Sequence, residues 1–441
     1  MNMAPSPPEP AHRAVYARMG KNVAWLVGGR GFTAVTSMFY LAIAARALGP
    51  HPFGAFTLVL AYGQAIANLA QFQSWQAVIR YGAAHLARGD RGGLARLVAF
   101  TTAMDVASVA VGVAVAALGV SVAGPWLGWT RAEEVRAAVF GSALLLSIGA
   151  TPTGVLRLLD RFDLITYIQA IGPSVRLAGS VAAWLAGAGV DAFLAVWAAA
   201  ALIQSAATWI VSLGRAGQRP AFARGLVGRV RADNAGILRF MGITNLSSSL
   251  SLLWEQLGTL AVGGIAGATA AGGFRLASRL AKAIVQPVQM FTRVLFPELA
   301  RLVASDDQAT LRRVTTRISL AAIGIAVLVV LVAVFGGKLL LALIAGRSFT
   351  FAHQLLLLLA IAAAVELSGF ALEPLLTAHG RAGAVLTARA VGTAMYGLLL
   401  AGLLSPMGAT GAAVAAIGGA IVVRLALAVA ARRLLRAGPP R

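Results

Sequence analysis

The 441-residue chain has no cysteine, few acidic residues and few charged residues of any kind. Without cysteine it can form no disulfide, use no thiol nucleophile and hold no thiolate-bound metal. Only 15 residues are Asp or Glu against 37 that are Lys or Arg, which gives a formal net charge of +22. Charged residues make up 12% of the chain, against about 25% in an ordinary soluble domain. These shortages exclude a soluble globular protein of average composition.

Apolar residues are what the chain has in excess. They make up 59% of it, and the mean hydropathy is +0.81. A membrane-spanning helix needs about 20 consecutive, mainly apolar residues. On this rule the sequence predicts an all-α polytopic membrane protein with twelve spans, at 22–45, 53–76, 97–122, 135–156, 164–187, 191–213, 241–263, 268–295, 315–335, 353–376, 384–404 and 409–431.

Arginine is concentrated in alternate loops and at both ends of the chain. The segment 214–240 contains the most arginine residues of these loops. The loops predicted on the other side of the membrane contain only Arg46, Arg131, Lys338 and Arg347. By the positive-inside rule, both termini are predicted to be cytoplasmic. The same rule and the attraction of anionic lipid headgroups account for the net charge, so no nucleic-acid partner is predicted. The segment 214–240 is interpreted as an amphipathic surface helix, with a plain solvated connector as the alternative.

A narrow polar stripe runs along the apolar segment 274–296. Its members recur at spacings of four and three residues, which places them within about 40° of one line on a helix: Arg275, Arg279, Lys282, Gln286, Gln289 and Arg293. A cation facing lipid costs about 3 kcal/mol at the bilayer centre. The stripe is therefore predicted to face a hydrated cavity that receives an anion. The alternative is a structural role, in which Glu255, Glu366 and Glu373 neutralise the cations.

The two halves of the chain match at an offset of 218 residues. Gly49, Gly54 and Phe56 correspond to Gly267, Gly272 and Phe274, and an uncharged stripe of Gln64, Asn68 and Gln71 corresponds to Lys282, Gln286 and Gln289. A parallel duplication predicts two pseudo-symmetric six-helix lobes with a site at their interface. The predicted parts are a tail (1–21), an N-terminal lobe (22–213), a linker (214–240), a C-terminal lobe (241–431) and a second tail (432–441).

Other ionisable residues lie inside predicted spans and are candidates for function. Arg30 and Glu255 lie on matched first helices of the two halves and are expected to line the cavity or to have structural roles. Asp105 lies close to the cytoplasmic end of its span, where it could pair with a loop arginine, and Arg176 lies in the fifth span. Glu255, Glu366 and Asp105 are the candidates for coupling to an ion.

Enzyme motifs are missing. The five histidines are scattered at no metal-ligand spacing, and no glycine-rich phosphate loop with a following Lys-Ser/Thr occurs. The predicted non-cytoplasmic loops are short, the longest being about 336–352. The sequence therefore predicts a protein that is not an enzyme, with no metal, no cofactor and no built-in ATPase.

Several short motifs, taken in order, resemble those of one transporter family. They are ARALG at 45–49 with FGAF at 53–56, LRLLDRFD at 156–163, FPELA at 296–300, LLTAHGR at 375–381 and GATGAA at 408–413. The chain is on this basis identified as similar to the Wzx-type polysaccharide flippases. These belong to the multidrug/oligosaccharidyl-lipid/polysaccharide (MOP) exporter superfamily.

The resemblance implies a V-shaped, MATE-like fold that moves an undecaprenyl-diphosphate-linked oligosaccharide across the inner membrane by alternating access, for O-antigen, capsule or exopolysaccharide. Arg275, Arg279 and Lys282 would hold the diphosphate, because arginine pairs well with phosphate, and Arg30 would assist from the other lobe. The amides would bind sugar hydroxyls: Gln64, Asn68, Gln71, Gln286 and Gln289. The implied partners are this lipid-linked oligosaccharide, membrane lipids and polysaccharide assembly proteins. The alternatives are a multidrug or small-metabolite exporter, a membrane glycosyltransferase or polymerase, and a non-transporting scaffold.

Overall fold

The computed structural model describes residues 9–216, 220–222, 224–304, 308–379 and 381–436. Side chains are described except in 9–27, 246–255, 286–312 and a few single positions such as Arg30. The described residues form helices joined by short turns. Their elements are α1 (Glu9–Leu48), α2 (Pro50–Ala70), α3 (Ser74–Ala87), α4 (Arg91–Leu127), α5 (Arg131–Leu146), α6 (Ala150–Leu158), α7 (Phe162–Leu185), α8 (Val190–Ala216), α9 (Leu226–Asp233), α10 (Ile237–Ala304), α11 (Gln308–Leu331), the π-helix η1 (Val332–Gly336), α12 (Gly337–Ile344), the 3₁₀-helix η2 (Arg347–Ala352), α13 (His353–Ser368), α14 (Leu372–Ala378) and α15 (Ala382–Arg436).

These helices confirm the all-α membrane fold. Within the described residues, nine helical stretches are long and apolar enough to cross a membrane, and two of them belong to helices that each contain two predicted spans joined end to end. The predicted span 164–187 forms the helix α7, which is not among the nine. Predicted spans 241–263 and 268–295 form α10, which continues across Gly267 in a non-helical conformation. Predicted spans 384–404 and 409–431 form α15 in the same way, across Gly408.

The predicted duplication is visible in the backbone. Gly49, between α1 and α2, has φ 72° and ψ 175°, and Gly267, 218 residues later, has φ 83° and ψ 173°. These positive φ values lie in a region that glycine reaches without steric cost. The two glycines thus place the same turn at equivalent points of the two halves.

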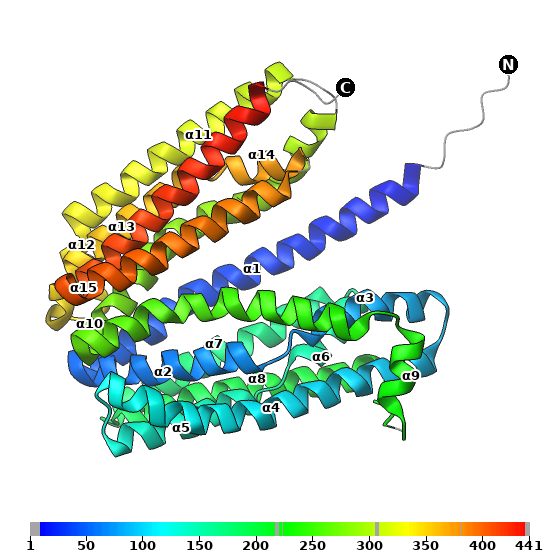
Figure 1. Cartoon of the computed structure of the whole chain (residues 1–441), viewed down its shortest axis with the longest axis horizontal. Helices are drawn as coiled ribbons and strands as arrows, with labels where there is room; N and C mark the ends of the chain where they lie inside the picture. The colour runs from blue at the N-terminus through cyan, green and yellow to red at the C-terminus, as the bar shows by residue number, and fades with distance from the viewer. Residues whose placement is uncertain (1–8, 217–219, 223, 305–307, 380, 437–441) are drawn as a thin grey trace.

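The helices form two groups that lie close together at one end and diverge toward the other (Figure 1). One group contains α2 to α8, with α1 packed on α7; the other contains α11 to α15. Helix α10 joins the groups, since it packs against α2 and also against α13 and α15. We call the converging end, where the chain turns at Gly49, the Gly49 end, and the opposite end the α9 end.

Glycine and aromatic residues hold the groups together at the Gly49 end. A β-carbon on Gly54 would overlap the carbonyl group of Ala268, and one on Gly272 would lie 3.0 Å from the Cα of Gly54. Beside this crossing, the rings of Phe53 and Phe349 meet edge to face with centroids 5.4 Å apart. The repeat-related glycines therefore let α2 and α10 cross in backbone contact, as small residues do in membrane helix pairs.

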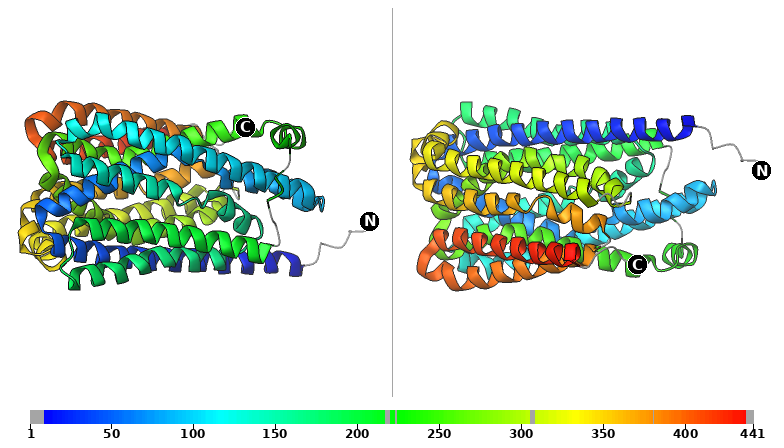
Figure 2. Two further views of the ribbon diagram at one scale, coloured as in Figure 1. Left: turned by 90° about the horizontal axis from the view of Figure 1, so that it is seen from below. Right: turned by 90° about the horizontal axis from the view of Figure 1, so that it is seen from above.

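The linker helix α9 runs across the ends of the long helices (Figures 1 and 2). Asp233 at its end forms an ion pair with Arg96 of α4 at 2.7 Å. Oδ1 of Asn234 accepts a hydrogen bond from Nε2 of the buried His85 ring at 3.0 Å. In α9 itself only Val230 is buried. The linker helix is thus fastened to the first group of helices by these polar contacts and by Val230 and Leu226, which pack in an apolar cluster with residues of α3 and α4.

Candidate functional site

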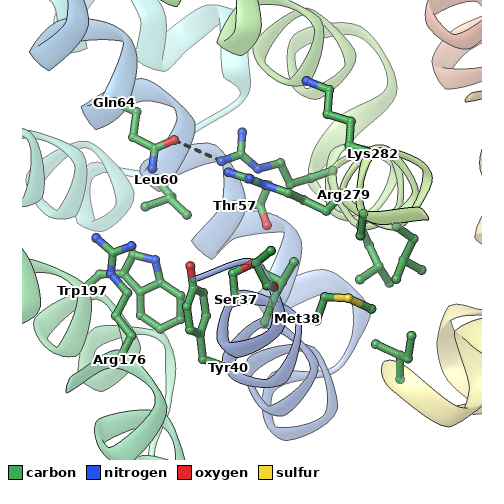
Figure 3. A pocket seen from close by; sticks show the side chains of 17 residues that line it. Ser37, Met38, Tyr40, Thr57, Leu60, Gln64, Arg176, Trp197, Arg279 and Lys282 are labelled. Carbon is green, nitrogen blue, oxygen red and sulfur yellow. Dashed lines mark hydrogen bonds between the residues drawn. The ribbon is translucent and has the colours of Figure 1, made fainter. Parts of the chain in front are cut away.

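A cavity of about 80 Å³ lies between α1, α2, α7, α8, α10 and α12. This space corresponds to several water molecules. Its walls combine apolar residues with a set of polar and aromatic side chains: Ser37, Tyr40, Thr57, Gln64, Arg176, Trp197, Arg275, Arg279 and Lys282 (Figure 3). Because α1, α2, α7 and α8 come from the first half of the chain and α10 and α12 from the second, the cavity lies where the two halves meet.

Arg275 is held in this cavity by amide groups. Its side chain is 7% exposed, and its Nη1 donates to Oε1 of Gln256 at 2.7 Å while Nη2 donates to Oε1 of Gln64 at 3.0 Å. The guanidinium thereby links α2 to both halves of α10. These two amide oxygens fix the position of the guanidinium group at the cavity.

Arg279 and Lys282 follow Arg275 on the same side of α10, at the spacing that the stripe predicted. Both side chains are exposed and both line the cavity. Figure 3 shows them on one side of the cavity and Arg176 on the other. The predicted stripe therefore supplies three cations to one space.

Arg176 supplies a fourth cation from α7. Its guanidinium carbon lies 5.9 Å from the ring centroid of Tyr40 and 5.8 Å from that of Trp197, within the range of cation–π attraction. Its Nε is buried and has no hydrogen-bond partner. A buried donor without a partner is costly, so a bound acceptor in this cavity would stabilise it.

No carboxylate appears among the described residues that line the cavity. Of the three acids that could have neutralised the stripe, Glu373 pairs with Arg389 at 2.9 Å in the second group of helices. Glu366 is not part of the lining, but this buried carboxyl group of α13 lies close enough to Lys282 to interact with it electrostatically. The side chain of Glu255 lies outside the described residues. The described part of the cavity is thus cationic, and an anion is the charge that it would attract.

The structure separates the predicted site residues into three sets. Four of them line the cavity: Arg275, Arg279, Lys282 and Gln64. Asn68 and Gln71 do not; Gln71 donates from Nε2 to the carbonyl of Leu144 at 3.0 Å and so ties the end of α2 to α5. The last set has side chains outside the described residues: Arg30, Gln286 and Gln289. Substrate binding by any of these residues stays a prediction.

Sequence reasoning named Arg176 as an intramembrane candidate but did not place it in the binding site, and it assigned no role to four other lining residues: Ser37, Tyr40, Thr57 and Trp197. Thr57 is the repeat partner of Arg275, at the offset of 218. The aromatic residues carried no such signal, since Tyr and Trp are common throughout membrane helices.

Asp105, an ion-coupling candidate, joins two broken helices. The predicted spans 53–76 and 135–156 are each interrupted, between α2 and α3 and between α5 and α6. Asp105 of α4 is 2% exposed and accepts hydrogen bonds from Ser74 Oγ, from Thr151 Oγ1 at 2.6 Å and from Thr151 N at 3.2 Å. Ser74 begins α3 and Thr151 lies in the first turn of α6, where the positive ends of helix dipoles favour a carboxylate. The expected pairing of Asp105 with a loop arginine is wrong, because these hydroxyl and amide donors occupy the carboxylate.

Asp105→Asn is expected to destabilise the protein by about 1–3 kcal/mol, because an amide nitrogen replaces one accepting oxygen and leaves a buried donor unsatisfied. The shift of the unfolding midpoint in detergent measures this. Asp191→Asn is the matched control, since Asp191 forms an exposed pair with Arg136 and such pairs contribute about 0–1 kcal/mol. Equal shifts for the two variants would show that the Asp105 contacts do not hold the broken helices.

Comparison with known proteins identifies the family. The family model described as "Polysaccharide biosynthesis protein" matches residues 19–303. The inner membrane protein YghQ of Escherichia coli (strain K12) is 30% identical over 339 residues, which cover 76% of this chain and 95% of that protein. The chain belongs to the polysaccharide biosynthesis protein family.

Solved structures place this member of the polysaccharide biosynthesis protein family in the MOP fold. The inward-facing structure of a multidrug resistance MATE transporter of the MOP superfamily has a TM-score of 0.70 at 14% identity, covering 92% of this chain and 96% of that one. The inward closed structure of the lipid II flippase MurJ has a TM-score of 0.68 at 10% identity, covering 93% and 87%. The family match and these folds confirm the resemblance to Wzx-type flippases of the MOP superfamily.

Proposed function

We propose that the protein is a flippase that moves an undecaprenyl-diphosphate-linked oligosaccharide across the bacterial inner membrane for the synthesis of a cell-surface polysaccharide. The observation that carries the proposal is the cationic cavity between the two halves of the chain. Arg176 approaches it from one half and Arg275 and Arg279 from the other. A diphosphate bears negative charge on two adjacent groups, so cations on both sides could hold it at once.

The size of the cavity limits which part of this substrate it could hold. About 80 Å³ is space for several waters, which suits a phosphate group and is far too small for an oligosaccharide. The glycan would therefore lie outside the cavity, toward the α9 end where the helix groups diverge, and Gln64 would remain beside the diphosphate. Arg30, Gln286 and Gln289 are proposed to extend this binding surface.

Alternating access would follow from motion of the predicted lobes 22–213 and 241–431 against each other. The arginine-rich linker lies at the α9 end, and the positive-inside rule supports the proposal that this end and both termini are cytoplasmic. In this orientation the helices are close together on the periplasmic side. The lobes would have to part at the Gly49 end to release the substrate.

A multidrug exporter is the second candidate, because a MATE transporter shares the fold. The positive charge of the cavity lining favours the flippase, since a cationic drug would meet four cations and no carboxylate among the described lining residues. A glycosyltransferase or polymerase would need catalytic acids or a base, and the cavity offers none in its described lining.

Flipping of a diphosphate-linked polyprenyl sugar in proteoliposomes tests the proposal. Arg279→Ala is expected to lower the rate about tenfold, the effect of losing one charge-assisted hydrogen bond of about 1.5 kcal/mol. Arg279→Lys is expected to retain part of the rate, because the charge remains without the guanidinium fork.

Arg347→Ala is the control, because Arg347 is exposed in η2 and lies outside the cavity lining. Unchanged flipping by the Arg279→Ala variant would remove the proposed role of Arg279. Failure of the wild-type protein to move the lipid, with uptake of a cationic dye instead, would favour the drug exporter.

A further inference from the structure

An apolar groove of about 520 Å³ lies beside the cationic cavity. Helix α1 forms one wall with side chains at helical spacing, and α7 and α12 form the others. The lining residues are Val35, Met38, Phe39, Ala42, Ile43, Arg46, Trp184, Leu343 and Ile344. Arg46 is the one charged residue among them. The groove extends along α1 from residue 35 to 46, which is roughly 16 Å at 1.5 Å per residue.

The groove and the cavity are adjacent. Met38 and Ile344 line both of them, so these two side chains lie between a polar and an apolar space. On the groove side the lining is open to the surroundings, since Phe39 is 60% exposed, Trp184 50% and Leu343 60%. In a membrane-spanning helix this exposed apolar face lies toward lipid, with the cationic cavity directly behind it.

Arg46 closes the groove at the Gly49 end. Its Nε donates to the carbonyl of Ile344 at 3.0 Å, and its Nη2 donates to the carbonyl of Leu343. These are the last carbonyls of α12, where a cation is favoured by the helix dipole. Arg46 thereby fastens α1, from the first half of the chain, to α12, from the second. The groove is thus formed at the junction of the two halves, as the cavity is.

We propose that this groove holds the polyprenyl chain of the lipid-linked cargo, at the units next to the diphosphate, while the diphosphate occupies the cationic cavity. This inference rests on the proposed function. The head and the chain are covalently joined, so a cargo whose diphosphate reaches Arg275 must bring its first isoprene units to within a few ångströms of the cavity. Apolar units held among guanidinium groups would displace the polar contacts of those groups.

The boundary at Met38 and Ile344 offers a way out of this conflict. When these two side chains move aside, the polyprenyl chain would pass from the polar cavity directly into the apolar groove. Both lining residues are flexible or aliphatic, and methionine adapts readily to irregular apolar ligands. The groove would thereby select cargo that carries a long apolar chain directly on its diphosphate.

Two groove-filling variants test the inference: Ala42→Trp and Ile43→Trp. The control is Val111→Trp, on an apolar position of α4 that is 63% exposed and belongs to neither lining. Binding to purified protein in detergent is measured for two ligands, a polyprenyl-diphosphate sugar and the same sugar diphosphate as its methyl ester. We expect the groove variants to bind the polyprenyl ligand about tenfold more weakly and the methyl ester within twofold of wild type. The control should be unchanged for both.

A second measurement avoids dependence on the bulky variants. The chain has no cysteine, so Phe39→Cys can be labelled at one position with a benzophenone maleimide, with Val111→Cys as control. Irradiation is expected to crosslink the polyprenyl ligand to position 39, and an excess of that ligand, but not of phospholipid, should compete. Crosslinking to phospholipid alone, or equally at both positions, would overturn the groove assignment.

The two proposals fail in different ways. If wild-type protein binds the polyprenyl ligand and the methyl ester equally and the tryptophan variants change neither affinity, the groove proposal is wrong and the diphosphate site stands. If wild type binds neither ligand, the proposed function is wrong, and the groove proposal is wrong with it.

Discussion

Replacing Arg275 with alanine is expected to lower flipping of a diphosphate-linked lipid by about 10- to 100-fold, the equivalent of about 1.5–3 kcal/mol for a charge-assisted hydrogen bond. This loss should exceed that of Arg279→Ala, because Arg275 is nearly buried and its position is fixed by Gln64 and Gln256. The same substitution also leaves both amide oxygens without this donor and removes one of the links between α2 and α10. Initial flipping rates in proteoliposomes, normalised to reconstituted protein, measure the effect.

The Arg275→Gln variant distinguishes the role of the Arg275 charge from the role of its hydrogen bonds. A glutamine can donate to one of the two amides but carries no charge, so its unfolding midpoint should be closer to wild type than that of Arg275→Ala, and its flipping rate should be nearly as low. Full transport by Arg275→Gln would mean that Arg275 serves only to join the helices. The control Arg347→Ala should flip at the wild-type rate.

Much of the fold could be predicted because it depends on local patterns. Apolar length predicted the helices, and the spacing of glycines at an offset of 218 predicted the duplicated turn now seen at Gly49 and Gly267. The periodicity of the cationic stripe correctly brought Arg275, Arg279 and Lys282 to one space, because that argument requires only that cations avoid lipid. Each of these inferences uses residues within one helix or one repeat.

The remaining features depend on contacts between helices that are distant in the chain. The interruption after α2 carries no proline, whereas the one after α5 is followed by Pro152 in the first turn of α6. Both interruptions are held by Asp105 from a third helix. Arg176 reaches the cavity only because α7 packs beside α1, where Tyr40 lies. Gln71 belongs to the predicted polar stripe, but it contacts α5, because the turn at the end of α2 redirects it. A one-dimensional pattern contains no information on which helix will be the neighbour.

The glycine crossing between α2 and α10 leads to the second large effect: Gly54→Val is expected to abolish transport. Any side chain at this position meets the backbone of Ala268 and Thr269, and backbone cannot rotate away as a side chain can. Overpacking of this kind costs about 1–3 kcal/mol or more, and here the strain would be relieved by parting the two halves of the chain at the Gly49 end. The variant should therefore fold but fail to close there.

Gly324→Val is the matched control, because Gly324 lies within α11 and has nothing within 4 Å of an added β-carbon. Closure can be measured through Thr57→Cys, since Thr57 is 1% exposed beside the crossing and the chain has no other cysteine. In the Gly54→Val background this thiol should react with a membrane-impermeant maleimide added from outside, and in the Gly324→Val background it should stay protected. Protection of the thiol in both backgrounds, or wild-type flipping by Gly54→Val, would show that closure at the Gly49 end does not depend on backbone contact at this glycine.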